Sequence, residues 1–531
     1  MAELRTPLFQ PQPREKWVQD LVRRAQRRLQ DMSEEALVQT LEDALYTERK
    51  RLERCKAEPG ELDNLERLSH ALVRGDARER IDAALTIVAF WGEEIHGKFD
   101  PRVYKFATRV LPRALTGILS ERPKTLRGLR HWDLSMGKRL RAEGDTHFLR
   151  ELTQEATLVL VPTHVSNMDS ALLGMALYQA DLPPFVYGAG LNLFENPVIG
   201  WWLRRLGAYT VDRRKRASLY KETLKDYSVL CMRAGLHSLF FPGGTRCRSG
   251  ALEDRLKKGL LGTTFQAWQE NIDAGDPRPD VYIVPCTLSY QLVLEAPTLI
   301  NDHLAEAGRG RYIIEDDEFS KPTVVANFLS RVLNLDASTV VRFGAPLDLF
   351  GTPVPRDAQA RQAASERRRR YVCDSDGAVE WDEQRDNLYT SQLASSIVDA
   401  YKVTTTVLTT HLACHVAWNM LAEQQGTTDP FRLVRTDVAG RHLLRSAYLE
   451  RLEQTLSAVK RGAEQGMWHH DLPATALAVL EIAVDRFGRF HKSKALADHG
   501  GDLIIEDPRL CLYYQNRLAG IDLAAFEPRE A

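Results

Sequence analysis

Cysteine is scarce in this chain, and no cysteines form a metal-binding or disulfide pattern. Seven cysteines are scattered over 531 residues, without a Cys-x-x-Cys pair. A zinc ribbon needs closely spaced cysteine pairs, and a small secreted domain needs many disulfides, so the sequence argues against both. A reducing, cytoplasmic setting is expected.

An excess of charge of one sign is also missing. The 71 basic and 72 acidic side chains leave a formal net charge of −1. This balance indicates neither nucleic-acid binding nor an acidic tail. Any electrostatic recognition must therefore come from local clusters of charge.

Long apolar runs that could cross a membrane are absent as well. The longest, residues 401–421, contains Lys402, His411 and His415. A spanning helix would place these polar groups in hydrocarbon, so we interpret the run as a buried helix. The first seven residues lack the basic and then apolar pattern of a signal peptide, so secretion by that route is not expected.

The apolar pattern divides the chain into four parts. Residues 1–125 show helical spacing and predict a helical N-terminal domain. Residues 126–352 alternate short apolar runs with helical stretches, which predicts an α/β domain. Residues 353–382 are rich in charge and include an arginine run at 367–370, which we expect to be a solvated linker or exposed insertion. Residues 383–531 predict a mainly helical C-terminal region.

Strands are expected where short runs of apolar, often β-branched residues occur in the α/β domain. These runs are residues 156–161, 238–241, 281–284 and 339–343. In such sheets, ligands gather beyond the carboxyl ends of the strands. The chemistry is therefore expected in this middle domain.

The most informative segment is Val-Pro-Thr-His-Val-Ser-Asn-Met-Asp-Ser, residues 161–170. It follows a predicted buried strand, and Ser166 or Asn167 could cap the helix that comes next. His164 then lies on the turn, where Asp169 could hold one imidazole nitrogen and leave the other to take a proton from an alcohol. These residues alone do not decide between a His-Asp dyad and a histidine and an aspartate that merely cap the helix.

Two further segments carry arginines that could bind an anion. In Phe-Pro-Gly-Gly-Thr-Arg-Cys-Arg-Ser-Gly, residues 241–250, the glycines allow a ligand to approach the backbone. The side-chain donors of this segment are Thr245, Arg246, Arg248 and Ser249. Residues 207–214 include Arg213, whose planar guanidinium suits phosphate. Taken singly, these segments are more simply explained as an ordinary tight turn and a solvated basic face, and the Gly-Lys-Ser/Thr ending of a P-loop is missing.

In combination these motifs resemble a known family. His-x4-Asp, then Gly-Ala-Tyr-Thr-Val-Asp-Arg, then the Gly-Gly-Thr-Arg segment, then Ile283-Val284-Pro285 follow in the order found in glycerolipid acyltransferases, most closely the glycerol-3-phosphate acyltransferases. The resemblance covers roughly residues 130–350. It implies that His164 is the general base and that Asp169 orients it.

The resemblance also implies a set of substrate-binding residues. The positions associated with glycerol phosphate in the family are Arg213, Gly244, Thr245 and Arg246 here, with Arg248 and Ser249 in the same motif, while Pro285 matches a motif linked to the acyl donor or the shape of the site. One departure stands out. The family usually has Phe-Pro-Glu-Gly-Thr-Arg, and Gly243 occupies the position of that glutamate.

The implied reaction moves a fatty acyl group from acyl-CoA or acyl carrier protein to the 1-hydroxyl of sn-glycerol 3-phosphate and makes lysophosphatidate for phospholipid biosynthesis. No metal and no cofactor is expected. Backbone N–H groups at the start of the helix after His164 are the expected oxyanion donors. Peripheral contact with the cytoplasmic face of a membrane is expected through Trp201, Trp202 and the arginines beside them.

Three alternatives remain open. Within the same chemistry, the chain could be a 1-acylglycerol-3-phosphate acyltransferase. It could instead be a non-catalytic lipid-binding member of the family. A thioester hydrolase that uses Cys247 or Ser249 is less favoured, because neither residue occupies a nucleophile elbow.

Overall fold

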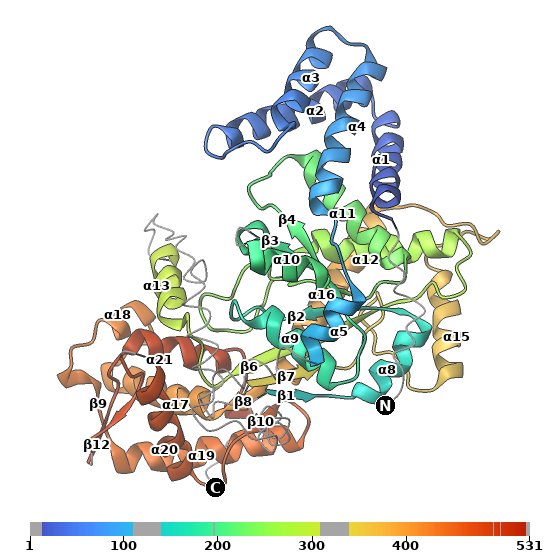
Figure 1. Ribbon diagram of the computed structural model, residues 1–531. Helices are drawn as coiled ribbons and strands as arrows, with labels where there is room; N and C mark the ends of the chain where they lie inside the picture. The colour runs from blue at the N-terminus through green and yellow to red at the C-terminus, as the bar shows by residue number, and fades with distance from the viewer. Residues whose placement is uncertain are drawn as a thin grey trace.

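A twisted sheet lies at the centre of the chain, with helices on its faces, a group of helices at one end and a mainly helical region at the other (Figure 1). The computed structural model describes residues 13–109, 140–194, 197–307, 339–491, 493–499 and 501–526. Predictions that fall on residues 1–12, 110–139, 308–338 and 527–531 lie outside the described residues.

The central sheet has seven strands. Their bounds are β1 Leu140–Glu143, β2 Thr157–Pro162, β3 Val186–Gly190, β4 Ala208–Val211, β5 Ser238–Leu239, β6 Val281–Tyr290 and β7 Thr339–Phe343. The order across the sheet is β1-β7-β6-β2-β5-β3-β4. Neighbours run parallel except β6 and β7, which are antiparallel. The predicted α/β class is confirmed, and the four predicted strands lie in β2, β5, β6 and β7.

β2 and β6 form the middle of the sheet and are buried along their whole length. Continuous burial explains why their sequences are apolar runs without alternation, as is usual for strands covered on both faces. Their register pairs Val161 with Pro285 and Pro162 with Cys286. The carboxyl end of β2 therefore lies beside the middle residues of β6, and His164 comes two residues after that end.

Helices cover both faces of the sheet. Their bounds are α8 Thr146–Glu155, α9 Asp169–Gln179, α10 Pro197–Arg205, α11 Ser218–Arg233, α12 Lys258–Asp273 and α13 Ala296–Ala307, with a 3-10 helix, η1, at Leu191–Phe194. The predicted cap of α9 by Ser166 or Asn167 is wrong in position. α9 begins at Asp169, its N-cap is Met168, and the Ser166 hydroxyl accepts the Met168 amide at 3.2 Å.

The N-terminal helices pack as a group against one edge of the α/β domain, at the top of Figure 1. Their bounds are α1 Arg14–Gln30, α2 Glu34–Leu52, α3 Glu61–Arg74 and α4 Ala77–Ile95. The next helix, α5 Pro101–Arg109, lies apart from this group and packs against α10. The shared core of the group, with Leu41 and Trp91, continues into β4 and α11 through Tyr209 and Tyr220. A buried lysine, Lys215, crosses this boundary to reach carboxylates of the helices.

The charged segment after β7 forms α15, Ala358–Arg369. Arg367, Arg369 and Arg370 are exposed, as expected of a solvated run. Arg368 is buried, contrary to that expectation, and its guanidinium lies 3.3 Å from carboxylate oxygens of both Asp280 and Asp348. Every fourth residue of a helix returns to one face, so one arginine of such a run can point inward while its neighbours face water.

The C-terminal region is helical with short strands inserted. Its bounds are α16 Glu383–Thr404, β8 Thr406–Leu408, α17 Thr409–Gln425, α18 Pro430–Val434, η3 Ala439–Arg441, β9 His442–Leu444, α19 Arg445–Glu464, β10 His469–Asp471, α20 Ala476–Phe490, β11 Ala497–Asp498, β12 Asp502–Ile504, α21 Pro508–Gln515, η4 Asn516–Leu518 and η5 Ala524–Phe526. Residues 401–421 are largely buried, as predicted, but β8 divides them between two helices. Across the ranges described, no helix has both the length and the apolar character to span a bilayer.

Candidate active site

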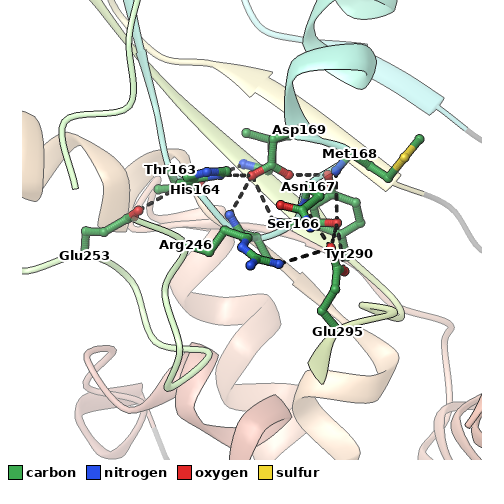
Figure 2. A network of polar contacts seen from close by, with 12 residues as sticks. Thr163, His164, Ser166, Asn167, Met168, Asp169, Arg246, Glu253, Tyr290 and Glu295 are labelled. Carbon is green, nitrogen blue, oxygen red and sulfur yellow. Dashed lines mark hydrogen bonds and ion pairs between the residues drawn. The ribbon is translucent and has the colours of Figure 1, made fainter. Parts of the chain in front are cut away.

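A histidine and an aspartate meet where β2 gives way to α9. The Nδ1 atom of His164 lies 2.8 Å from Oδ2 of Asp169 (Figure 2). The side chain of His164 is 15% exposed, whereas that of Asp169 is 0% exposed. The turn brings together two residues that would diverge on one continuous helix. The predicted dyad is therefore present as a geometric pair.

Asp169 is held by donors from three directions. Its Oδ2 accepts the amides of Val165 at 2.6 Å and Ser166 at 3.0 Å, and its Oδ1 accepts the hydroxyl of Tyr290. An ionised carboxylate only accepts hydrogen bonds, so His164 donates through Nδ1–H. Its Nε2 then carries a free lone pair, which is the form that a general base needs.

The four amides between His164 and α9 already donate hydrogen bonds within the protein, so oxyanion donation by the first amides of α9 stays a prediction. Val165 and Ser166 donate to Asp169, Asn167 donates to Glu295 at 2.9 Å, and Met168 donates to Ser166. An oxyanion hole requires donors that point at the reacting oxygen. These four amides instead fix the turn that carries the dyad.

Glu295, which directly precedes α13, binds the same turn from the other side. Its carboxylate accepts the Ser166 hydroxyl at 3.0 Å and lies 3.6 Å from the guanidinium of Arg246. Burial raises the pKa of Glu295, and the hydrogen bond from the Asn167 amide opposes this effect. Glu295 therefore links the turn that carries the dyad to the loop of residues 241–250, which contains Arg246, as Figure 2 shows.

Arg213 and Arg246 bring two positive charges to the mouth of the site. Arg213 is exposed overall, but partial burial of its guanidinium lowers its pKa, and the nearby charge of Arg246 lowers it further. Within the described ranges, no acidic side chain pairs with Arg213. The two arginines repel each other, and no carboxylate among the described residues pairs with both of them. A dianion such as a phosphate monoester would bind favourably there.

The loop of residues 241–250 lies beside the dyad. Phe241 stacks on the His164 ring with centroids 4.1 Å apart, and the Cys247 amide donates to the His164 carbonyl at 2.7 Å. Gly244 has a φ of +77°, which favours glycine, and Thr245 beside it is exposed. The loop can therefore present the Thr245 hydroxyl to a ligand.

Two predicted substrate residues of this loop are engaged elsewhere. Arg248 forms an ion pair with Glu306 of α13. The Ser249 hydroxyl accepts the Ala251 amide at 3.3 Å and lies 3.4 Å from the Cys247 sulfur. Burial raises the pKa of the Cys247 thiol, which disfavours the nucleophilic thiolate. The geometry thus assigns Arg248 and Ser249 local contacts, and their roles toward substrate stay predictions.

Pro285 lies inside the sheet and apart from the loops. It pairs with Val161 of β2, is buried, and its carbonyl accepts the Gly344 amide at 2.8 Å. It can influence the site through the packing beneath the dyad. A direct contact with substrate stays a prediction.

Glu253 is a neighbour of the dyad that the sequence did not reveal. Its Oε1 accepts the His164 amide at 2.7 Å, and in Figure 2 it lies on the opposite side of His164 from Asp169. No motif marks this residue, because it approaches His164 only after the chain turns back beyond Gly250. Tyr290 and Glu295 had a sequence signal, as they follow the Val-Pro pair of the fourth motif.

No group of three or more His, Cys, Asp or Glu side chains able to hold a metal ion occurs in the part of the chain that the structure describes. All seven cysteines are free thiols.

Residues 144–289 match the model of a protein family described as Acyltransferase. This span runs from the end of β1 to the penultimate residue of β6 and contains the dyad and both arginines of the site mouth. The match to this family therefore covers the middle of the chain, where the dyad lies.

Several curated relatives carry the name glycerol-3-phosphate acyltransferase. The protein of Xanthomonas axonopodis pv. citri (strain 306) is 30% identical over 226 residues, which is 40% of this chain and 24% of the relative. That of Xanthomonas campestris pv. campestris is 31% identical over 207 residues, 38% of this chain and 22% of the relative. That of Aeromonas hydrophila subsp. hydrophila is 35% identical over 156 residues, 29% of this chain and 18% of the relative. The similarity therefore spans less than a quarter of the length of these relatives.

Proposed function

We propose that this protein transfers a fatty acyl group from an acyl thioester to the 1-hydroxyl of sn-glycerol 3-phosphate and forms lysophosphatidate. The observation that carries the proposal is the His164–Asp169 pair, with its 2.8 Å hydrogen bond, together with two arginines whose charges are near enough to repel each other. The acyltransferase domain and the names of the relatives support the same reaction.

His164 acts as the general base. Its Nε2 takes the proton of the glycerol hydroxyl as the oxygen attacks the thioester carbonyl, and the ionised Asp169 stabilises the imidazolium that results. The tetrahedral intermediate collapses with loss of the thiolate, which receives the proton back from His164. Base catalysis of this kind contributes about 10²- to 10⁴-fold to the rate.

Arg213 and Arg246 hold the phosphate of the acceptor. Each guanidinium can give two parallel hydrogen bonds to phosphate oxygens, which fixes orientation as well as charge. Glu295 keeps Arg246 aimed from the dyad turn, so the phosphate and the base are linked through one set of contacts. The acceptor hydroxyl is thereby placed near Nε2 of His164.

The acceptor is tested by measuring thiol release from acyl-CoA with three additions: sn-glycerol 3-phosphate, 1-acylglycerol 3-phosphate, or buffer alone. We expect release to depend on glycerol 3-phosphate. Faster release with 1-acylglycerol 3-phosphate would favour the later step of phosphatidate formation. Release without any acceptor would indicate a hydrolase, and no release from acyl-CoA or acyl carrier protein would leave only a binding role.

We further propose peripheral binding to the cytoplasmic face of a membrane through the surface formed by α5 and α10. Trp201 is 45% exposed and Phe106 is 47% exposed, and the guanidinium of Arg205 lies 4.0 Å from the centre of the Trp201 ring. Phe106 stacks on Trp202 at 5.8 Å, so the two helices share one aromatic and basic surface. Exposed tryptophans flanked by arginine suit the interface of an anionic bilayer.

Sedimentation with vesicles that contain anionic phospholipid tests this surface. We expect the variant Trp201→Ala/Arg205→Ala to lose most of the bound fraction. Trp381→Ala is a matched control, because this tryptophan is 54% exposed on a different part of the chain. Equal sedimentation of all three proteins would contradict the placement.

A further inference from the structure

The space beside Gly243 is filled by another residue. A Cβ atom added to Gly243 would lie 3.1 Å from both Cγ and Oε1 of Glu253. These separations are tighter than ordinary van der Waals contacts, so the side chain of Glu253 would have to shift by a few tenths of an ångström. The backbone at Gly243 does not have the positive φ that favours glycine, so the steric conflict with Glu253 is what limits a side chain here.

Glu253 reaches this space because the chain folds back on itself after the third motif. The Lys257 amide donates to the Pro242 carbonyl at 2.8 Å, which closes the segment onto the start of the loop. Lys257 then lies over Gly244, where an added Cβ would meet its Nζ at 2.6 Å. The segment between Gly250 and Lys257 therefore forms a lid over Gly243 and Gly244, with Glu253 on its inner side.

The backbone N–H and C=O groups of His164 are both hydrogen-bonded to residues 247–253. The N–H donates to Oε1 of Glu253 at 2.7 Å, and the carbonyl accepts the Cys247 amide at 2.7 Å. The Asp169 bond fixes the ring, and these two bonds fix the main chain from which the ring projects. An error of about 1 Å in the position of a base can cost about 100-fold in rate, so such support affects catalysis.

The burial of the Glu253 carboxyl group also supports a role in holding the main chain of His164. Its Oε2 is buried and accepts no hydrogen bond from the described residues. Burial raises the pKa of Glu253 to about 7, while the His164 amide and then the positive charge of Arg517 act against this shift. Arg517 is itself buried, and its guanidinium donates to the Leu288 carbonyl at 2.6 Å. A carboxyl group kept in such a costly place needs a compensating contact, and the His164 amide supplies it.

We infer that Glu253 is a positioning residue that fixes the main chain of His164, and that glycine at position 243 lets Glu253 hold this place without a steric conflict. The departure from the family motif at Gly243 then has a steric reason, since a carboxylate from residue 253 stands where a side chain of residue 243 would lie. The inference rests on the proposed function for its kinetic consequences, and its structural part can be measured without activity.

A double-mutant cycle between positions 243 and 253 tests the shared space. Glu253→Ala should lower kcat by about 10- to 100-fold and leave the KM for glycerol 3-phosphate nearly unchanged. Gly243→Ala should lower kcat because the new methyl displaces Glu253. Since both act through one contact, the double variant should be no worse than Glu253→Ala alone. Glu253→Gln keeps an acceptor oxygen and should retain most of the activity.

Two control variants separate this contact from general damage. Asp254→Ala removes an exposed carboxylate next to Glu253, and Gly259→Ala adds a methyl whose nearest neighbour is 3.9 Å away. Both should keep the kcat of the wild type. A double variant whose loss equals the product of the two single losses would overturn the inference, as would a folded Glu253→Ala protein with full kcat.

Hydrogen exchange of the His164 amide gives a readout that does not need turnover. We expect this amide to exchange faster in Glu253→Ala and at the wild-type rate in Asp254→Ala. Unchanged exchange in Glu253→Ala would overturn the inference. If the wild type transfers no acyl group but the exchange changes as expected, the proposed function fails and the contact stands.

Discussion

Three buried carboxyl groups surround His164, and each one does something different. Asp169 holds the ring through Nδ1, Glu295 holds the following turn and Arg246, and Glu253 holds the amide of His164 itself. Together these contacts restrain both the ring and the main chain of His164. The free nitrogen Nε2 is therefore presented in one orientation, which favours proton transfer at a defined place.

The two arginines at the mouth of the site should matter for the acceptor more than for the acyl donor. Arg213→Ala removes a charged hydrogen-bond donor, a loss of about 1.5–3 kcal/mol, and should raise the KM for glycerol 3-phosphate about 10- to 100-fold. The KM for acyl-CoA should stay close to that of the wild type. Initial-rate kinetics with each substrate varied in turn measure both constants.

Arg216→Ala is the matched control for this change, because Arg216 is exposed and lies three residues further along the same loop. It should leave both constants unchanged. An equal rise in the acceptor KM for Arg213→Ala and Arg216→Ala would mean that general positive charge, and not the position of Arg213, attracts the substrate.

Glu253 should also make the free energy of unfolding depend on pH. Its pKa is raised from 4.5 to about 7 by burial, so the folded state binds its proton more tightly than the unfolded state does. Between these two values the unfolded state carries fewer protons, and the free energy of unfolding falls as the pH rises. Glu253→Gln removes this contribution, so urea unfolding of the variant should depend less on pH between about 4.5 and 7. Identical pH profiles for both proteins would show that the carboxyl group titrates normally.

At the scale of elements, the loop of residues 241–250 is fitted against α21. Gly250 has a φ of +83°, and an added Cβ would lie 2.1 Å from the Tyr513 carbonyl. The Asn516 side chain donates to the Ser249 carbonyl at 2.8 Å. A helix near the end of the chain therefore supports the loop that carries Arg246.

Gly250→Ala should disturb this contact. We expect it to lower both the unfolding midpoint in urea and kcat, because the methyl would push the loop away from α21. Gly275→Ala is the control, as Gly275 has a φ of +66° and nothing within 4 Å of the added atom. That variant should lose only about 1–2 kcal/mol from backbone strain and none of its kcat. Equal effects of the two substitutions would show that only the backbone strain matters.

The elements that carry the dyad could be predicted from sequence because they rest on local patterns. Continuous apolar runs indicated β2 and β6, and the polar turn after β2 placed His164 and Asp169 together. The helix cap was predicted wrongly, since its position depends on which amides Asp169 and Glu295 bind. Glu253 could not be found, because its approach to His164 depends on a fold-back that no local pattern specifies.

At the scale of the whole molecule, the regions outside the matched domain complete the site. The match to the family model ends within β6, whereas Glu295, Arg517 and α21 all lie beyond it. On the N-terminal side, Lys215 forms ion pairs with carboxylates of the N-terminal helices, and it lies on the same loop as Arg213. The flanking regions therefore contact the two loops that carry Arg213 and Arg246.

Lys215 is the residue that tests this connection. Its side chain is 1% exposed, forms an ion pair with Glu94 and lies 3.6 Å from Glu61. Glu61 keeps its ion pair with Arg51, but Lys215→Met removes the cation that pairs with Glu94 and should lower the free energy of unfolding by about 3–5 kcal/mol. The KM for glycerol 3-phosphate should also rise, since the loop that carries Arg213 loses its anchor.

Lys225→Met is the matched control, because Lys225 forms only a surface ion pair with Glu222. It should change stability by less than about 1 kcal/mol. Urea unfolding of the two variants decides the matter. A Lys215→Met protein as stable as Lys225→Met would contradict the anchoring role of the N-terminal helices.

The most direct test of the account is the transfer of a labelled acyl group from acyl-CoA to sn-glycerol 3-phosphate by the wild type and by His164→Ala, with lysophosphatidate identified by mass spectrometry. Folding of the variant is checked by circular dichroism. We predict that the wild type forms labelled lysophosphatidate and that the folded variant forms it at least about 100-fold more slowly. Formation at the wild-type rate by folded His164→Ala would contradict the proposed role of the dyad.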